Sequence, residues 1–208
     1  TLICPEGEYK TSVPIPGKHN ILNALASVAA LIALGYNPQD VAEAMKKLPA
    51  VPGRMEKIDC GQPFQVLVDY AHTPDALVNL LDAVKPITPG RIITVFGCGG
   101  DRDRTKRPLM GEAVSNRSDL TIVTSDNPRT EEPTKIIDDI IPGLKEGSEY
   151  RIIPDRGTAI QMAIRIAADG DAVVIAGKGH EDYQIIGHEV HKFDDREKAR
   201  EALNRAGF

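Results

Sequence analysis

Four short segments of the sequence concentrate side chains that bind small charged molecules, and each follows an apolar run typical of a buried strand. In an open α/β sheet, ligands bind beyond the carboxyl ends of the strands. Four polar segments at that edge therefore predict one binding site. The segments are Asp69-Tyr70-Ala71-His72-Thr73, Gly97-Cys98-Gly99-Gly100-Asp101-Arg102, Ser125-Asp126-Asn127-Pro128-Arg129 and Gly177-Lys178-Gly179-His180-Glu181.

The third segment combines a carboxylate (Asp126), an amide (Asn127), a rigid turn (Pro128) and a guanidinium (Arg129) within four residues. Arginine presents a planar fork that matches a carboxylate through two parallel hydrogen bonds. Proline fixes its own φ and restricts the residue before it, which holds the neighbouring side chains in place. The alternative is an Asx-type turn whose arginine faces solvent.

Two arginines and a glutamate suggest a class of ligand. Arg102 and Arg129 suit carboxylates and Glu181 suits an ammonium group, so the three together favour a zwitterion. Lys178 would meet a phosphate as a point charge, although its segment lacks the spacing of a P-loop. The alternative for that segment is a flexible turn with solvated charges.

The glycine-rich segment at residues 97–102 invites comparison with a dinucleotide-binding loop. It lacks the third glycine of G-x-G-x-x-G, and Asp101 and Arg102 occupy positions where a cofactor would approach the backbone. We therefore expect no nicotinamide cofactor. The glycines are better explained as freeing the backbone so that Arg102 reaches inward.

Two further pairs of polar residues invite a functional interpretation. Asn20 and Asn23 are three apart, so on a helix both amides face the same way near its N-terminus, where they would read an adenine edge or, for Asn20, cap the helix. His188 and His191 lie in an expected hairpin with no third ligand nearby, and we expect no metal there.

Alternating β and α patterns position these segments. Apolar runs predict buried strands at residues 66–68, 92–96, 120–123 and 173–176, and a weaker one at 151–153. Helical patterns lie at residues 74–84 (capped by Thr73), 133–141 (with Glu131-Glu132 at its start) and 157–168. A small hairpin at 184–186 and 190–193 leads to a terminal helix capped by Asp194 or Asp195. The predicted fold class is α/β, a Rossmann-like mostly parallel sheet with helices on both faces.

The first fifty residues form a separate pattern. Short extended pieces precede a helix that ends near Gly35, and Asn37-Pro38 opens a second helix. Residues 49–53, Pro-Ala-Val-Pro-Gly, are the best linker in the chain. We predict one domain over residues 1–52 and another over residues 53–208.

Composition excludes several classes of protein. The 208 residues carry 30 acidic and 25 basic side chains, a net charge of −5, which argues against a nucleic-acid partner. No apolar run approaches the length of a membrane span. Three distant cysteines suit a reducing cytoplasm. The chain begins with Thr in a strand-like region, so we expect a piece of a longer protein.

An ordered set of motifs across nearly the whole chain resembles the C-terminal half of the Mur ligases, most closely their MurE type. The matching stretches are residues 17–23 (Gly-Lys-His-Asn-Ile-Leu-Asn), 52–56, 69–74, 97–111, 126–129 and 177–181. The resemblance implies that residues 1–52 end the central ATP-binding domain and that residues 53–208 form the amino-acid-binding domain.

The resemblance also implies a reaction. ATP phosphorylates the D-glutamyl carboxylate of UDP-N-acetylmuramoyl-L-Ala-D-Glu, and the amine of an incoming diamino acid then attacks the acyl phosphate. The Asp-Asn-Pro-Arg motif resembles the version that selects meso-diaminopimelate over lysine. An arginine built to pair with the distal carboxylate is left unpaired by lysine, and this gives large discrimination.

Site residues carried over from the family fall into two groups. Those implied to contact diaminopimelate are Arg102, Asp126, Asn127, Pro128, Arg129, Gly177 and Glu181, with Asn127 and Arg129 on the distal carboxylate and Glu181 on the distal ammonium. Those implied on the ATP side are Asn20 and Asn23 (adenine), Asp69 (ribose), Arg54 (phosphates) and His72, which lies beside that edge.

The chain also departs from the family pattern. The 208 residues contain no P-loop, no UDP-binding domain and none of the part that supplies a modified lysine and most Mg²⁺ ligands. We therefore expect no catalytic residue, no metal ligand and no ligation from this chain alone. The implied full enzyme is a cytoplasmic monomer that uses ATP and Mg²⁺.

Three other functions stay open. One is a lysine-adding enzyme or a related amide ligase such as a polyglutamate synthetase, which the Asp-Asn-Pro-Arg motif disfavours. Another is a non-catalytic binding module of the same fold. The third is a nicotinamide-dependent dehydrogenase domain, for which we expect no NADH binding.

Overall fold

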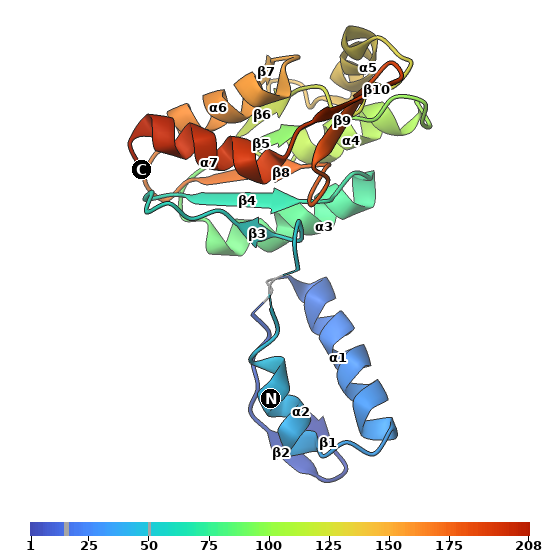
Figure 1. The fold of residues 1–208 in the computed structure, drawn as a ribbon, viewed down its shortest axis with the longest axis vertical. Coiled ribbons are helices and arrows are strands. Elements are labelled where there is room, and N and C mark those ends of the chain that lie inside the picture. Colours follow the sequence, from blue (N-terminus) through green and yellow to red (C-terminus); the bar gives the residue numbers. More distant parts are fainter. Residues whose placement is uncertain (15–16, 50) are drawn as a thin grey trace. The chain divides into compact units, whose positions relative to one another are not determined.

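The computed structural model describes residues 1–14, 17–49 and 51–208, and the chain divides into two compact units, residues 1–51 and 52–208 (Figure 1). Ala50, at the centre of the expected linker, lies outside the described residues. That the two units correspond to two domains of a larger enzyme stays a prediction.

The first unit contains a β-hairpin and two helices. Strands β1 (Leu2–Cys4) and β2 (Gly7–Tyr9) pair antiparallel, and α1 (Lys18–Ala33) and α2 (Pro38–Met45) follow. Helix α2 begins as predicted, because the Asn37 side chain accepts a hydrogen bond from the backbone N–H of Gln39. The small core of this first unit contains Leu2, Val28, Val41, Ala42 and Met45.

The second unit is built on a six-stranded sheet with the strand order β3-β4-β8-β5-β6-β7. All neighbouring pairs are parallel except β3 with β4. The strands are β3 (Glu56–Lys57), β4 (Gln65–Asp69), β5 (Ile92–Phe96), β6 (Leu120–Val123), β7 (Tyr150–Ile152) and β8 (Ala172–Ala176). The central strands β5, β6 and β8 are buried along their whole length, as their apolar runs predict.

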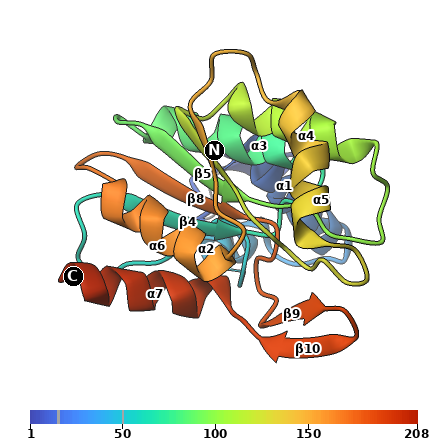
Figure 2. The same ribbon diagram turned by 90° about the horizontal axis from the view of Figure 1, so that it is seen from above.

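Helices cover both faces of this sheet (Figure 2). One face packs on α3 (Pro74–Val84), α4 (Lys106–Ser115) and α5 (Pro133–Ile140), with 3₁₀ turns at Lys85–Ile87 and Ile141–Gly143. The other face packs on α6 (Arg156–Ile166) and α7 (Asp195–Ala206). Two apolar cores therefore enclose the sheet and hold its strand ends in fixed positions.

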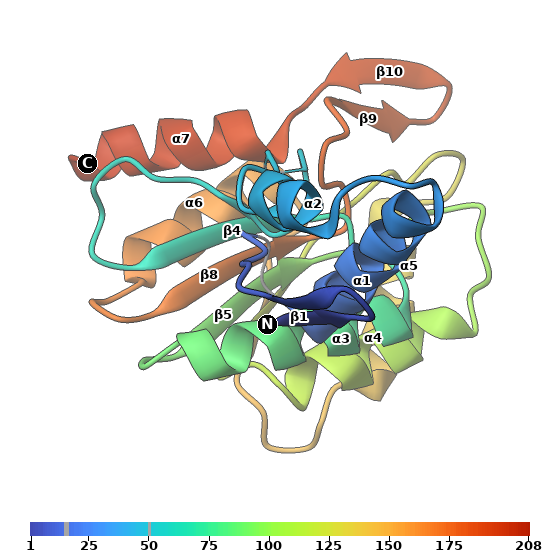
Figure 3. The same ribbon diagram turned by 90° about the horizontal axis from the view of Figure 1, so that it is seen from below.

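A hairpin of β9 (Tyr183–Ile186) and β10 (Glu189–Lys192) leads directly into α7 (Figure 3). Asp194 caps α7 by accepting from the N–H of Arg196, and Thr73 caps α3 by accepting from the N–H of Ala76. Both caps confirm the sequence-based expectation, and so does the fold class. The short antiparallel strand β3 and the bounds of α4 were not predicted.

Candidate functional site

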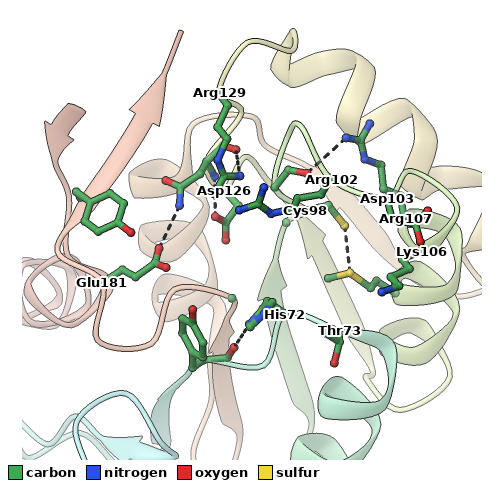
Figure 4. Close-up of a pocket in the computed structure, with 17 residues that line it drawn as sticks. His72, Thr73, Cys98, Arg102, Asp103, Lys106, Arg107, Asp126, Arg129 and Glu181 are labelled. Atoms are coloured by element: carbon green, nitrogen blue, oxygen red, sulfur yellow. Dashed lines mark hydrogen bonds between the residues drawn. The ribbon is translucent and has the colours of Figure 1, made fainter. Parts of the chain in front are cut away.

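The four polar segments lie together around one cavity of about 470 Å³ at the carboxyl ends of β4, β5, β6 and β8 (Figure 4). Glu181 lies on one side of the hollow, Lys106 and Arg107 on the other, and His72 and Thr73 below. Predicted ligand residues that line it are Arg102, Asp126, Asn127, Arg129, Gly177 and Glu181, together with His72 from the ATP-side group. Pro128 is buried beside it.

Asn127 is almost fully buried, with 3% of its surface exposed, and both ends of its amide are bonded. Its Oδ1 accepts from the backbone N–H of Ile185 at 3.0 Å and from Lys178 Nζ at 3.1 Å. Its Nδ2 donates to Glu181 Oε2 at 3.1 Å. The amide therefore links the segments that follow strands β6 and β8 to strand β9 at the cavity wall.

Arg129 is held by its backbone as well as by its side chain. Its φ of +50° places it in the left-handed region, and its N–H donates to the Ile185 carbonyl while its own carbonyl accepts from Gly187. Nη1 donates to the carbonyls of Gly100 (2.8 Å) and Asn127 (3.4 Å). Nε and Nη2 bond to no described residue, so they remain available to a ligand. The alternative of a solvent-facing arginine on an Asx-type turn is wrong.

The glycines of the 97–100 segment have a different role from the one expected. A Cβ on Gly97 would come within 2.3 Å of the Thr124 carbonyl oxygen, and one on Gly100 within 1.9 Å of the Pro128 carbonyl oxygen. The glycines therefore allow the two loops to touch backbone to backbone. Arg102 itself is exposed and donates to the Asp101 carbonyl.

A buried arginine that sequence reasoning missed joins these two loops. Arg107 is 1% exposed and bonds to both oxygens of Glu131, to Asp139 and to the Gly99 carbonyl. Its hydrogen bonds lower the pKa of the Glu131 carboxyl. Glu131 was expected only at a helix start. For Arg107, the only hint in the sequence is that it belongs to the lysine-arginine pair at the start of α4.

Lys178 is not placed to contact a phosphate, contrary to the interpretation offered by the sequence, because it is buried. Its side chain is fully buried, and Nζ lies 3.3 Å from Glu181 Oε2 in addition to its bond to Asn127. Its ammonium also lies 5.4 Å from the centre of the Tyr183 ring. The Glu181 carboxylate beside Tyr183 raises the pKa of that phenol. The alternative of a flexible turn with solvated charges is therefore also wrong for Lys178.

The residues expected on the ATP side lie in both units. In the second unit, both carboxylate oxygens of Asp69 accept backbone N–H groups, from Met55 and Ala71 at 2.8 Å each. Asp69 therefore orders the loops on either side of it. In the first unit, Asn20 and Asn23 lie in the first turns of α1. Because Gly17 is the N-cap, Asn20 does not cap that helix.

An aromatic cluster missed by sequence reasoning surrounds Arg54 and His72. The Arg54 guanidinium lies 5.0 Å from the centre of the Tyr70 ring. The rings of His72 and His180 lie 4.6 and 5.4 Å from that of Tyr70. A planar base or a phosphate group would find stacking surfaces and a cation here. No pattern in the sequence signals that the two histidines meet on one tyrosine.

Two buried groups support the site from beneath. The Arg156 guanidinium pairs with both oxygens of Asp195 and donates to the Ala176 and Ser125 carbonyls, which ties the ends of β6 and β8 together. Cys98 is buried, and this burial raises the pKa of its thiol to about 12, so it stays protonated and is not a nucleophile.

Within the described ranges, no group of three or more His, Cys, Asp or Glu side chains is placed to hold a metal ion. The exposed His191 lies 3.3 Å from Glu189. In the same ranges, no helix has the length and apolar character needed to cross a lipid bilayer.

Comparisons with known proteins were made on the sequence and on the fold. A family model described as "Mur ligase, glutamate ligase domain" matches residues 53–179. The chain is 54% identical to the UDP-N-acetylmuramoyl-L-alanyl-D-glutamate–2,6-diaminopimelate ligase of a Nostoc species, a match that covers 98% of the chain and 41% of that relative. It is 50% identical to the ligase of that name from Alkaliphilus metalliredigens, over 100% of the chain and 42% of the relative.

Solved structures agree. One structure of a UDP-N-acetylmuramoyl-L-alanyl-D-glutamate–2,6-diaminopimelate ligase is 40% identical, with a TM-score of 0.75 over 99% of this chain and 42% of that one. The UDP-N-acetylmuramate-alanine ligase MurC of Thermotoga maritima, at 23% identity and a TM-score of 0.65 over 94% of this chain and 39% of that one, shares the fold. The chain spans about two-fifths of the length of the curated relatives it matches.

Proposed function

The chain belongs to the Mur ligase family and is homologous over nearly its whole length to the last two-fifths or so of MurE enzymes, and from that premise we propose that its second unit binds meso-2,6-diaminopimelate. The longer enzyme would join this amino acid to UDP-N-acetylmuramoyl-L-alanyl-D-glutamate in peptidoglycan precursor synthesis. The observation that carries the proposal is the cavity at the carboxyl ends of the strands, which is lined by both cationic and anionic side chains, Arg102 and Arg129 with Glu181 and Asp126.

The charges of the cavity match those of the ligand. Meso-diaminopimelate carries an ammonium and a carboxylate at each end. We assign the distal carboxylate to Arg129 and Asn127, which line the cavity and keep N–H groups that bond to no described residue, and the distal ammonium to Glu181. Arg102 is the remaining cation of the predicted set, and its exposed position suits the carboxylate at the other end.

Asp126 and Gly177 complete the predicted set. A Cβ on Gly177 would lie 2.6 Å from Asp126 Oδ2, so the glycine lets the carboxylate stay at the cavity wall. Pro128 is buried between Asn127 and Arg129 and fixes the turn that aims them.

Selectivity against lysine follows from the same geometry. Lysine lacks the distal carboxylate, so its binding would desolvate the guanidinium of Arg129 without pairing it. Leaving a charged donor unpaired in a partly buried site costs several kcal/mol, typically about 1.5–3 per hydrogen bond to a charged group. A preference for meso-diaminopimelate over lysine of about 100-fold or more is the result.

ATP is proposed as the second substrate of the longer enzyme. Arg54, His72 and Tyr70 offer a cation and stacking surfaces, and Asp69 orders the loops beside them. Asn20 and Asn23 would contribute from the first unit. Among the described residues, no group of three or more His, Cys, Asp or Glu side chains is placed to hold the Mg²⁺ of such a reaction.

In the proposed reaction, a D-glutamyl carboxylate oxygen attacks the γ-phosphorus of ATP and ADP leaves. The amine of diaminopimelate then attacks the acyl carbon, phosphate leaves, and an amide forms. The 208 residues contain no P-loop, and phosphate positioning supplies most of the rate of such reactions. We therefore propose that this chain binds the amino acid and does not ligate it by itself. A cytoplasmic, monomeric enzyme stays our expectation.

An NMR titration of the ¹⁵N-labelled chain with meso-diaminopimelate tests this function, with L-lysine as the matched ligand. We expect shifts confined to the segments that carry Arg102, Asn127 and Glu181, and none of comparable size with lysine. An equal response to lysine would overturn the assigned substrate in favour of a lysine-adding ligase. Shifts confined to residues outside the cavity would overturn the site.

A further inference from the structure

Lys178 is a fully buried ammonium that contacts two residues of the cavity wall, Asn127 and Glu181, and no ligand-binding role accounts for it. A buried cation is tolerated only where it is paired and hydrogen-bonded. Lys178 meets that condition, since Nζ lies 3.1 Å from Asn127 Oδ1 and 3.3 Å from Glu181 Oε2, with the face of Tyr183 nearby. Two of its three partners are residues assigned to the ligand.

These contacts determine which way the Asn127 amide faces. Oδ1 accepts two hydrogen bonds, from Lys178 Nζ and from the Ile185 N–H, so both of its lone pairs are used. A flipped amide would turn its own N–H groups against these two donors and lose both bonds. Nδ2 therefore faces Glu181, to which it donates at 3.1 Å. One of its two N–H groups is left without a partner among the described residues.

The same contacts hold Glu181. Its Oε2 accepts from both Lys178 and Asn127, while Oε1 bonds to no described residue. The wall of the cavity thus presents one amide N–H donor and one carboxylate oxygen side by side. This is the arrangement that a carboxylate and an ammonium on one carbon require.

We propose that Lys178 is a positioning residue that sets the polarity of the cavity wall: it keeps the Asn127 amide turned with its donor outward and anchors Glu181 beside it. The identity of the ligand rests on the function proposed above, whereas the orientation of the amide does not. Removal of Lys178 would take away one of the two donors to Asn127 Oδ1 and one of the two donors to Glu181 Oε2. The Ile185 N–H and the Asn127–Glu181 bond would then hold the amide alone and less tightly.

The test compares the Lys178→Met and Lys178→Gln variants of the whole chain. In Lys178→Met, we expect the Asn127 side-chain N–H₂ signals to shift and broaden. The affinity for meso-diaminopimelate should fall by about tenfold or more, a loss like the one seen at metal sites when a partner that holds a ligand residue is removed. The preference over L-lysine should fall with it, because the misplaced donor serves only the distal carboxylate. Lys178→Gln retains a donor for Asn127 Oδ1 and should recover the amide signals and part of the preference.

Arg91→Met is the matched control. Arg91 pairs with Asp171, a carboxylate only 4% exposed, just before the amino ends of strands β5 and β8 and so at the other end of the strands from the cavity. Its loss should lower stability and leave the Asn127 signals and the preference unchanged. Unchanged Asn127 signals in Lys178→Met, or a weaker affinity with an unchanged preference, would overturn the proposal.

A measurement on the unaltered chain covers the case in which Lys178→Met does not fold. A buried, bonded ammonium exchanges its protons slowly, so a ¹⁵N signal from Lys178 Nζ with contacts to the Asn127 side chain is expected. A rapidly exchanging Lys178 ammonium would overturn the proposal. If the unaltered chain does not bind meso-diaminopimelate, the proposed function is contradicted. The Asn127 side-chain signals of the variants still test the role of Lys178 in that case.

Discussion

At the scale of single residues, the site contains two kinds of side chain that differ in how far sequence could predict them. Arg129, Asn127 and Glu181 stand out because their types match a charged ligand and each follows a predicted strand. Arg107 lines the cavity and Lys178 contacts two residues that line it, but both are buried, which no local pattern reveals. Their burial results from the packing of segments that are far apart in the sequence.

Cys98 gives a prediction at this scale. With a pKa raised by burial to about 12, only about one thiol in ten thousand is ionised at pH 8. Alkylation by iodoacetamide, followed by mass spectrometry, should modify Cys98 at least 100-fold more slowly than Cys4 and Cys60, which are only partly buried. Denaturant should abolish the difference. Equal rates in the native chain would contradict this description of the cavity floor.

At the scale of elements, the strands and caps followed from local pattern, whereas the contacts between loops did not. Strands β5 and β6 have the predicted bounds because continuous apolar runs are typical of buried parallel strands. Gly97 and Gly100 lie in a loop, as predicted, but glycine is needed there because the loop backbone touches the backbone of residues 124–128. Such an approach depends on strand order, which sequence periodicity does not reveal.

Gly53 gives a test of one such contact. It has a φ of +67°, and a Cβ there would lie 2.2 Å from the backbone nitrogen of His180. Gly53→Ala should lower the free energy of unfolding by about 3 kcal/mol or more, because neither backbone has room to shift cheaply. Gly61, with a φ of +94° and open space around it, is the matched control. Gly61→Ala should cost only about 1–2 kcal/mol. Equal losses in urea denaturation would show that the contact is unimportant.

Glu131 gives a pH-dependent prediction for the two loops that it joins. Because hydrogen bonds from Arg107 hold its pKa below the ordinary 4.5, the ionised form stabilises the native state. That contribution is full above pH 4.5 and is lost as the pH falls through the lowered native pKa. Glu131→Gln should cost about 1–3 kcal/mol at pH 7, and the gap from wild type should narrow below pH 4.5.

The control for Glu131 is Glu112→Gln. Glu112 lies on the exposed side of α4, and its side chain bonds to no described residue. Its unfolding free energy at pH 7 should match that of the wild type. If the difference in unfolding free energy between wild type and Glu131→Gln stays constant down to pH 2.5, the pairing with Arg107 does not stabilise the carboxylate form of Glu131.

At the scale of the whole molecule, the family and the fold class were predictable because ordered motifs cover nearly the whole chain. The proline-rich segment at residues 49–53 includes the point at which the chain divides into two compact units, and the assignment of these units to two domains stays a prediction. Asn20 and Asn23 belong to the first unit, whereas Arg54, Asp69 and His72 belong to the second. Sequence periodicity describes each unit separately and does not predict whether these residues meet. A complete ATP site therefore remains a proposal, while the cavity that we propose for the amino acid is formed within residues 52–208.

A prediction about activity belongs at this scale. Incubated with ATP, Mg²⁺, UDP-N-acetylmuramoyl-L-alanyl-D-glutamate and meso-diaminopimelate, the 208-residue chain should release no phosphate above background, because no P-loop positions the nucleotide. A full-length relative is the positive control. Amide formation by the chain alone would show that its residues suffice for phosphoryl transfer.

The central claim is that Arg129 and its neighbours select a diamino acid by its distal carboxylate. Calorimetric dissociation constants of wild type and Arg129→Ala for meso-diaminopimelate and L-lysine test it most directly. We predict that wild type prefers meso-diaminopimelate by about 100-fold or more and that the preference falls below about tenfold in Arg129→Ala. Equal affinity of wild type for the two ligands, no binding of meso-diaminopimelate, or an unchanged preference in the variant would contradict the claim.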